Sequence, residues 1–161
     1  IQACTPRVPQ LTTVMRTSHV RAADLEERWY LFDASTQPLG RMASQIATLL
    51  MGKDQPTYTP SEPCGAHVVV TNAAQVQVTG NKAEQLEYAF YSGYPGGLKE
   101  VPFERLRERD PERIVRLAVR RMLPKTRLGK QMLGRLRIYA GTDHPHTAQK
   151  PVAYEAPARR A

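Results

Sequence analysis

Two short apolar runs, with a helical pattern between them, limit the folds open to this chain. The runs WYLFDA at residues 29–34 and HVVV at residues 67–70 have the length and composition of buried strands. Between them, residues 41–51 carry apolar side chains at helical spacing, and Gly52 stands at a natural helix end. The order strand, helix, strand predicts a βαβ unit with a right-handed crossover.

The clearest helix is predicted to begin at Pro111, where a missing N–H costs nothing, with Asp110 as its N-cap. Pro124 is expected to end it. Further patterns predict a half-exposed strand at 75–78 and a strand pair or extended loop around a Gly-rich tip at 86–103. They also predict a short helix at 127–136, loosened by Gly129 and Gly134, and a strand at 137–140.

Positive charge is concentrated in one segment of the chain. Residues 113–142 hold nine bases and no acid, whereas the whole chain has a net charge of +8. Ordinary solvated helix faces mix the two signs, because like charges at i, i+4 repel. Here Arg113, Arg116 and Arg120 form a stripe without a compensating acid. This pattern favours a nucleic-acid partner over a solvated face.

The same segment argues for RNA and against a membrane surface. Interfacial helices present bulky apolar residues such as Trp and Phe, and neither occurs between residues 113 and 142. The chain also has no apolar run near the ~20 residues that span a bilayer. Helix, proline turn, glycine-loosened helix and strand follow one another within the segment, which suits an irregular folded RNA better than a regular groove.

Catalytic, metal and nucleotide sites find little support in the sequence. GYPGGLK at 93–99 matches no phosphate-loop motif, and a hairpin tip touching RNA, with Tyr91 and Tyr94 available for stacking, is favoured. DHPH at 143–146 lacks further metal ligands, so RNA contacts or a surface turn are favoured. Asp33 could be a lone catalytic carboxylate, but a carboxylate that bonds backbone N–H groups of the next turn is favoured.

The N-terminal residues and the cysteines bear on the compartment. Residues 1–23 contain three arginines and no acid, and the chain opens with IQAC. This composition is typical of an organelle transit region or the extension after its cleavage site, an ordinary disordered arm being the alternative. The two cysteines, Cys4 and Cys64, form neither a disulfide framework nor a zinc motif and fit a reducing compartment.

Five stretches resemble the large-subunit ribosomal protein L-thirteen family in its bacterial and organelle form. They are WYLFDASTQPLGRMASQIATLLMGK, VVVTNAAQVQVTGNK, GYPGGLK, PERIVRLAVRRMLPKTRLGKQMLGRLRIYAG and HPHTAQKP, in family order from Trp29 to Pro151. The resemblance implies a three-layer α/β domain with a central, mostly parallel sheet flanked by helices. We expect this domain at 28–151, with flexible extensions at 1–27 and 152–161 that have no family counterpart.

The resemblance also implies a structural role in the large ribosomal subunit of an organelle, plastid first and mitochondrion second. The expected partners are large-subunit rRNA and neighbouring ribosomal proteins, without catalysis, cofactor, metal, membrane or small-molecule substrate. A nucleotide-dependent enzyme and an extra-ribosomal RNA-binding regulator remain the alternatives. The predicted rRNA-binding residues are Arg41, Lys53, Lys82, Tyr91, Gly96, Gly97, Lys99, Arg120, Arg121, Lys125, Arg127, Lys130, Arg135, Arg137, His144 and His146.

Overall fold

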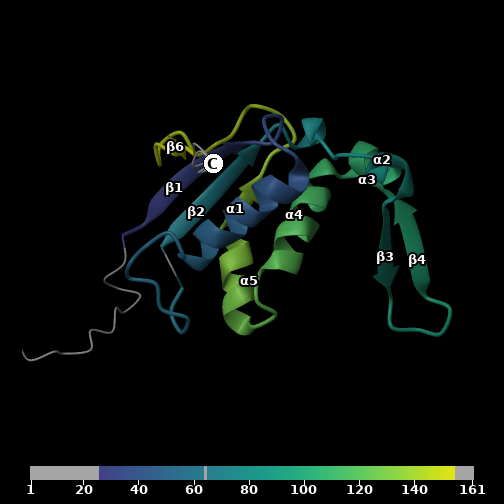
Figure 1. Cartoon of the computed structure of the whole chain (residues 1–161), viewed down its shortest axis with the longest axis horizontal. Helices are drawn as coiled ribbons and strands as arrows, with labels where there is room; N and C mark the ends of the chain where they lie inside the picture. Colours follow the sequence, from purple (N-terminus) through teal and green to yellow (C-terminus); the bar gives the residue numbers. More distant parts are fainter. Residues whose placement is uncertain (1–25, 64, 155–161) are drawn as a thin grey trace, which may run out of the picture.

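The computed structural model describes residues 26–63 and 65–154, which form two sheets and several helices (Figure 1). The central sheet has the strand order β5-β2-β1-β6, and all its pairings are parallel. Its strands are β1 (Arg28–Asp33), β2 (Ala66–Thr71), β5 (Leu136–Ile138) and β6 (Val152–Ala153). A second sheet is the antiparallel pair of β3 (Glu87–Tyr91) and β4 (Leu98–Pro102).

The predicted βαβ unit is confirmed. Strands β1 and β2 pair in parallel along their whole length, from Arg28 opposite Ala66 to Asp33 opposite Thr71. Helix α1 (Leu39–Met51) joins them and begins two residues before the predicted start. It ends at Gly52, whose φ of 78° lies in the left-handed region that glycine adopts without strain.

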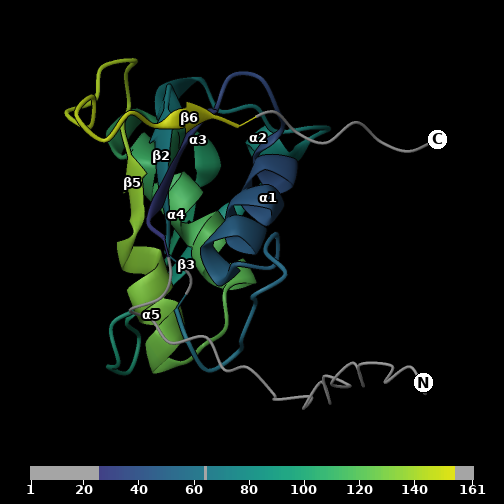
Figure 2. The ribbon, with the colours of Figure 1, turned by 90° about the vertical axis from the view of Figure 1, so that its left-hand side faces the viewer.

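The hydrophobic core lies between the sheet and three helices on one of its faces. Val68 and Val70 of β2 are fully buried in one cluster with residues of α1, α4 (Pro111–Met122) and α5 (Arg127–Gly134). Because side chains alternate along a strand, His67 and Val69 point to the opposite face. Figure 2 shows the segment after β5, in yellow, and helix α1 on opposite sides of β2. The α/β class is therefore confirmed, and a C-terminal segment forms the layer on the second face.

The β3–β4 hairpin projects from the helical layer (Figure 1). Its base is held by the short helices α2 (Lys82–Gln85) and α3 (Phe103–Arg109), where the Phe103 N–H donates to the Leu86 carbonyl at 2.9 Å. Gly93 and Gly96 at its tip have φ values of 90° and 72°. The prediction of a strand pair around a glycine-rich tip is confirmed.

The predicted strand at 75–78 is wrong. Residues Ala73–Gln75 form one 3₁₀ turn, and only Gln77 makes an isolated bridge, to Pro38. The reason lies just after β2, where Asn72 adopts a left-handed φ of 58° and turns the chain. The next N–H groups then donate to carbonyls that follow β5, which replaces a strand ladder with local turn contacts. The last strand is also displaced, because β5 spans Leu136–Ile138 in place of 137–140.

Residues at the start of the predicted C-terminal tail belong to the central sheet. Val152 and Ala153 form β6 opposite Tyr30 and Leu31 of β1, and the Tyr154 ring stacks on Phe32 with centroids 4.6 Å apart. Residues 152–154, at the start of the segment predicted as a C-terminal tail, therefore pack against β1. The proposed transit-like region and residues 155–161 lie outside the described residues. Within the described chain, no helix has the length and apolarity needed to cross a membrane.

Candidate nucleic-acid interface

Helix α4 separates a buried apolar face from an exposed basic one. Ile114, Val115 and Val119 are at most 1% exposed and fix the helix against the core. The arginine stripe on its outer side is exposed. Asp110 occupies the N-cap position as predicted, but its side chain makes no capping hydrogen bond and lies 3.7 Å from Nε of Arg109. Core packing thus fixes the direction in which the stripe faces.

The turn after α4 places more cations beside the stripe. Leu123 and Pro124 end the helix, and Thr126 caps α5 by accepting the Gly129 N–H at 3.3 Å. Gly129 is buried, and a Cβ on it would collide with the carbonyl oxygen of Pro124. This close approach of backbone to backbone holds the basic start of α5 next to the end of α4.

Two aromatic side chains of the hairpin face the arginines of α4. Arg113 lies over the Phe90 ring, with its Cζ 4.4 Å from the centroid, and Arg121 lies 5.6 Å from the centroid of Tyr88. Tyr88 is only 4% exposed, and its burial raises the pKa of the phenol, with the Arg121 charge acting in the opposite direction. Cation–π contacts therefore join the hairpin to α4.

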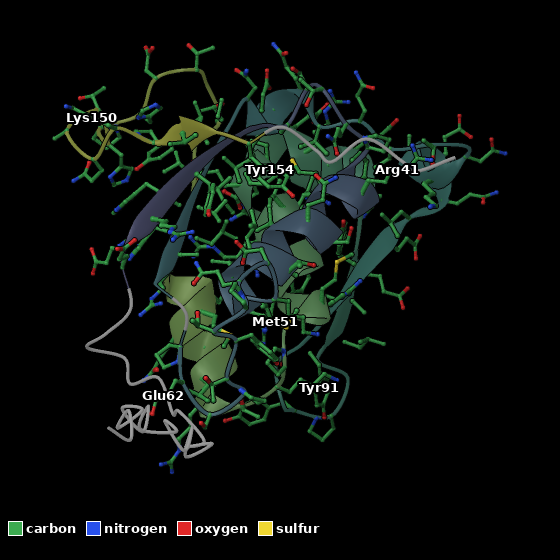
Figure 3. The ribbon with its side chains drawn as sticks, turned by 60° about the vertical axis from the view of Figure 1, so that its left-hand side comes forward. Arg41, Met51, Glu62, Tyr91, Lys150 and Tyr154 are labelled. Atoms are coloured by element: carbon green, nitrogen blue, oxygen red, sulfur yellow. The ribbon has the colours of Figure 1, made fainter. Side chains whose placement is uncertain are left out.

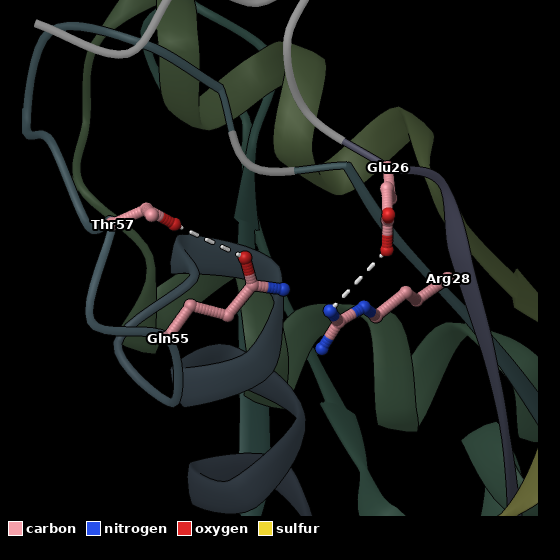
Figure 4. Close-up of polar contacts among 4 residues, drawn as sticks. All are labelled: Glu26, Arg28, Gln55 and Thr57. Atoms are coloured by element: carbon pink, nitrogen blue, oxygen red, sulfur yellow. Dashed lines mark hydrogen bonds and ion pairs between the residues drawn. The ribbon is translucent and has the colours of Figure 1, made fainter.

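Between β3, α4 and α5 lies a cleft of 860 Å³, which we call the basic cleft. All its charged lining residues are cations: Arg113, Arg116, Arg120, Arg121, Lys125 and Lys130. No ion pair among the described residues involves any of the six. By contrast, Arg28 on β1 lies 3.5 Å from Glu26 (Figure 4). The cleft thus concentrates positive charge that the described protein does not neutralise.

Five of the predicted site residues line this cleft: Tyr91, Arg120, Arg121, Lys125 and Lys130. The prediction missed Arg113 and Arg116, although the stripe that contains them was visible in the sequence. It also missed Tyr88 and Phe90, because nothing in the local pattern of β3 shows that a distant helix packs against it. The structure is what brings the hairpin aromatics and the α4 cations together.

Another group of predicted residues lies near the opposite face of the central sheet. Arg137 is aligned with Val69, so its side chain points away from the helices. On that face the Trp29 and His67 rings stack 4.5 Å apart, and the His146 ring lies 5.2 Å from Trp29. The hydroxyl of Tyr139 and Nε2 of His146 are 2.9 Å apart. His146 therefore contacts the sheet directly.

The environment of His67 disfavours its charged form. Burial lowers the pKa of this imidazole first, and the charges of Arg135, Arg137 and His146 lower it further, whereas Glu27 opposes them. Arg135 and Arg137 are thus close enough to this face to act on His67. Three predicted site residues are associated with this side of the sheet: Arg135, Arg137 and His146. The predicted residue His144 comes two positions before His146 and is half-buried.

The remaining predicted residues are dispersed. Figure 3 shows Arg41, in the first turn of α1, well apart from Tyr91 on the hairpin. Lys53 follows α1, Lys82 begins α2, and Arg127 begins α5 outside the lining of the cleft. Lys99 is aligned with Phe90 and shares its face of the hairpin. Gly96 and Gly97 shape the tip, where a Cβ on Gly97 would collide with the side chain of Ser92.

Asp33 stabilises a turn, in agreement with the favoured interpretation. Its Oδ1 accepts the Ser35 N–H at 2.9 Å, the Ser35 hydroxyl at 2.8 Å and the Asn72 amide at 3.0 Å. Burial raises the pKa of this carboxyl, but these hydrogen bonds outweigh it and lower the pKa overall. In the part of the chain that the structure describes, no cluster of three or more His, Cys, Asp or Glu side chains could hold a metal.

The described residues thus form an α/β scaffold with a cleft lined by cations and aromatic rings and by no acid, a surface of the class that suits a polyanion. The model of the family described as Ribosomal protein L13 matches residues 27–145. A protein of Chloroflexus aggregans named large ribosomal subunit protein uL13 is 53% identical over 140 residues, covering 87% of this chain and 98% of its own length. Proteins of the same name from Roseiflexus sp. and Thermosipho africanus are 51% and 49% identical, covering 88% and 86% of this chain and 97% and 93% of their own lengths. The chain belongs to the ribosomal protein L13 family, as the sequence resemblance indicated.

Proposed function

We propose that this protein is a structural constituent of the large ribosomal subunit and binds its rRNA through the basic cleft. The observation that carries the proposal is that all six charged side chains lining the cleft are cations. Relatives that match this chain over 98% and 97% of their own length are named as large ribosomal subunit proteins. The expectation that the protein is not an enzyme agrees with membership in a family of structural ribosomal components.

Phosphate groups supply the countercharge that the described residues do not provide. Arg116 and Arg120 stand one turn apart on α4, where two like charges repel each other in the free protein. A phosphate between them removes this repulsion and releases the counterions condensed on the RNA. Binding should therefore weaken steeply with salt, with each lost contact reducing the slope by a fixed amount.

The predicted residues outside the cleft are proposed as additional contacts. Arg135, Arg137, His144 and His146 would form a second contact near the opposite face of the sheet. The others are exposed positions on helices, turns and the hairpin: Arg41, Lys53, Lys82, Gly96, Lys99 and Arg127, with the half-buried Gly97 beside them. A protein that touches RNA on two faces would join separate rRNA segments, which is the role expected of a structural ribosomal protein. Neighbouring ribosomal proteins would occupy surface that the RNA leaves free.

Matched double variants test the cleft assignment. Arg116→Ala with Arg120→Ala should lower the salt slope of rRNA binding by about 1.4 to 1.8, from ~0.7 to 0.9 per phosphate contact. Arg105→Ala with Arg109→Ala removes the same charge from exposed positions of α3 outside the cleft lining and should change the slope less. Binding is measured by filter retention over a salt series. Equal changes in the two doubles, or none in the first, would refute the assignment.

We also propose a plastid ribosome as the site of action, with the mitochondrial ribosome as the alternative. The support is the arginine-containing, acid-free composition of residues 1–23. The bacterial relatives do not distinguish the two organelles. Sedimentation of plastid and mitochondrial ribosomes through a high-salt cushion tests the proposal, since the protein should remain with one large subunit. Recovery only in the soluble fraction would contradict the ribosomal assignment.

A further inference from the structure

We propose that the basic cleft holds an unpaired stretch of RNA, one or two unstacked nucleotides, in preference to double-stranded RNA. This inference rests on the proposed rRNA function and specifies which part of the RNA enters the cleft. Three features of the cleft carry it: its size, the arrangement of stacking planes, and the identity of its cations.

The size of the cleft matches nucleotides. Its volume of 860 Å³ falls within the ~300–1,000 Å³ that is usual for pockets holding drug-sized ligands. An A-form RNA duplex is much bulkier, because it carries two backbones around a stack of base pairs. Paired RNA can therefore contact the cations at the rim, whereas only an extruded nucleotide can enter between the hairpin and α4.

The walls of the cleft offer prearranged stacking planes. Arg113 is already stacked over Phe90 at 4.4 Å, and Arg121 lies over Tyr88 at 5.6 Å. Unstacked bases of RNA loops and bulges stack on aromatic rings or on guanidinium planes. A base that stacks on Arg113 from the side away from Phe90 would add a third layer to this pair. Paired bases already stack within their own helix and gain nothing from such a surface.

The cations suit a bent, exposed RNA backbone. Arg116, Arg120 and Lys130 line the same cleft as the stacked pairs, so a phosphate can be neutralised while its base is stacked. Four of the six lining cations are arginines, whose planar guanidinium can bind a phosphate through two parallel hydrogen bonds. Phosphate binding and base stacking by the same short segment require the nucleotide to leave its helix.

The test compares the binding of two RNAs that have the same base composition, at the same salt concentration. One is a stem–loop with 2-aminopurine in its unpaired loop, and the other is a continuous duplex. The full chain should bind the stem–loop about five-fold more tightly or better, the lower end of base–aromatic stacking strength. The 2-aminopurine fluorescence should change on binding, because it reports stacking. Equal affinity for the two RNAs would overturn the inference and leave the proposed function standing, whereas binding to neither would refute both.

Charge-conserving variants isolate the stacking plane. Arg113→Lys keeps the charge but removes the guanidinium plane, and should reduce the stem–loop preference by about five-fold or more while leaving duplex binding nearly unchanged. Phe90→Leu keeps an apolar side chain without the ring and should reduce the preference in the same direction. Arg105→Lys on α3, outside the cleft lining, is the control and should leave both affinities unchanged. Full stem–loop preference in both cleft variants would overturn the inference.

Two competitors distinguish RNA from other anions of similar chemistry. Free ATP should displace the stem–loop only weakly, since it lacks the flanking phosphates at the rim. Polyglutamate should also displace it weakly, because its carboxylates offer no base to stack. Displacement by either competitor at concentrations comparable to those of the stem–loop would overturn the inference, and for ATP would favour a nucleotide pocket.

Discussion

The two glycines of helix α5 make a sharp test of how the basic cleft is built. Both Gly129 and Gly134 were expected from the sequence to loosen this helix. In the structure they differ completely: a Cβ on Gly129 would collide with the backbone carbonyl of Pro124, whereas a Cβ on Gly134 would meet nothing within 4 Å. The same substitution, glycine to alanine, should therefore change stability in opposite directions at the two positions.

The magnitudes follow from two opposing contributions. Alanine is preferred to glycine inside a helix by up to about 1 kcal/mol. At Gly129 this gain competes with overpacking, which typically costs ~1–3 kcal/mol. Since the obstructing atom belongs to backbone and cannot swing away, the upper end applies and a net loss of about 2 kcal/mol is expected. Gly134 is the last residue of the helix, so Gly134→Ala should gain only about 0.5 kcal/mol.

Thermal and urea unfolding measure both effects. For a protein of this size, ~1 kcal/mol shifts the melting temperature by roughly 2–4 °C. Gly129→Ala should thus lower it by about 4–8 °C, and Gly134→Ala should raise it by about 1–2 °C. Urea midpoints should move in the same sense without a change in slope. If the Gly129→Ala variant is as stable as the unchanged protein, the contact between the Gly129 and Pro124 backbones does not set the position of α5.

Two further predictions concern titrating groups. Asp33→Ala should cost about 1–3 kcal/mol, because the Ser35 and Asn72 donors lose their acceptor. Because the pKa of Asp33 is lowered in the folded protein, its contribution to stability is complete above pH 3.8 and is lost as the pH falls through the folded pKa. The urea midpoints of the unchanged protein and of Asp33→Ala should therefore converge in acid. A difference that stays constant with pH would contradict the assignment. His67 stacks on Trp29, the only tryptophan, and its pKa is lowered, so Trp fluorescence should titrate with a midpoint below pH 6.5. His67→Gln should reduce this transition, with the His146 ring, 5.2 Å from Trp29, left as the other imidazole beside the indole. The stability that neutral His67 contributes is complete above pH 6.5 and is lost as the pH falls through the lowered folded pKa. A fluorescence midpoint above pH 6.5 would contradict this.

Local sequence patterns predicted most of the elements because each pattern has a local cause. Helix α4 begins at Pro111 as predicted, since proline suits the first helical position wherever the helix packs. The error at 75–78 has the opposite origin: alternating residues fit a strand, but the left-handed turn at Asn72 and carbonyls far along the chain determined the conformation. Likewise, the two residues of β6 carry no strand pattern of their own, because their pairing with β1 is what makes them a strand.

For the candidate site, sequence reasoning located the cations and missed what stands opposite them. The charge of α4 can be read from the sequence, because a run of bases without acids is a property of neighbouring residues. The pairing of Arg113 with Phe90 joins residues more than twenty positions apart, through a hairpin whose orientation depends on α2 and α3. Such a contact is fixed by tertiary packing, and no local periodicity encodes it.

The way the hairpin is attached explains how the cleft keeps its charge. Glutamates on β3 facing α4 could have anchored the hairpin by ion pairs, but they would have neutralised the arginines that a phosphate must find free. Phe90 and Tyr88 attach to Arg113 and Arg121 through their rings, which attract a cation without carrying a compensating charge. The acids of the hairpin strands stand elsewhere: Glu87 and Glu100 are not among the lining residues of the cleft, and their positions alternate with those of Tyr88 and Phe90. Aromatic anchoring thus holds the hairpin beside α4 without neutralising the arginines, and the proposed binding of RNA depends on both.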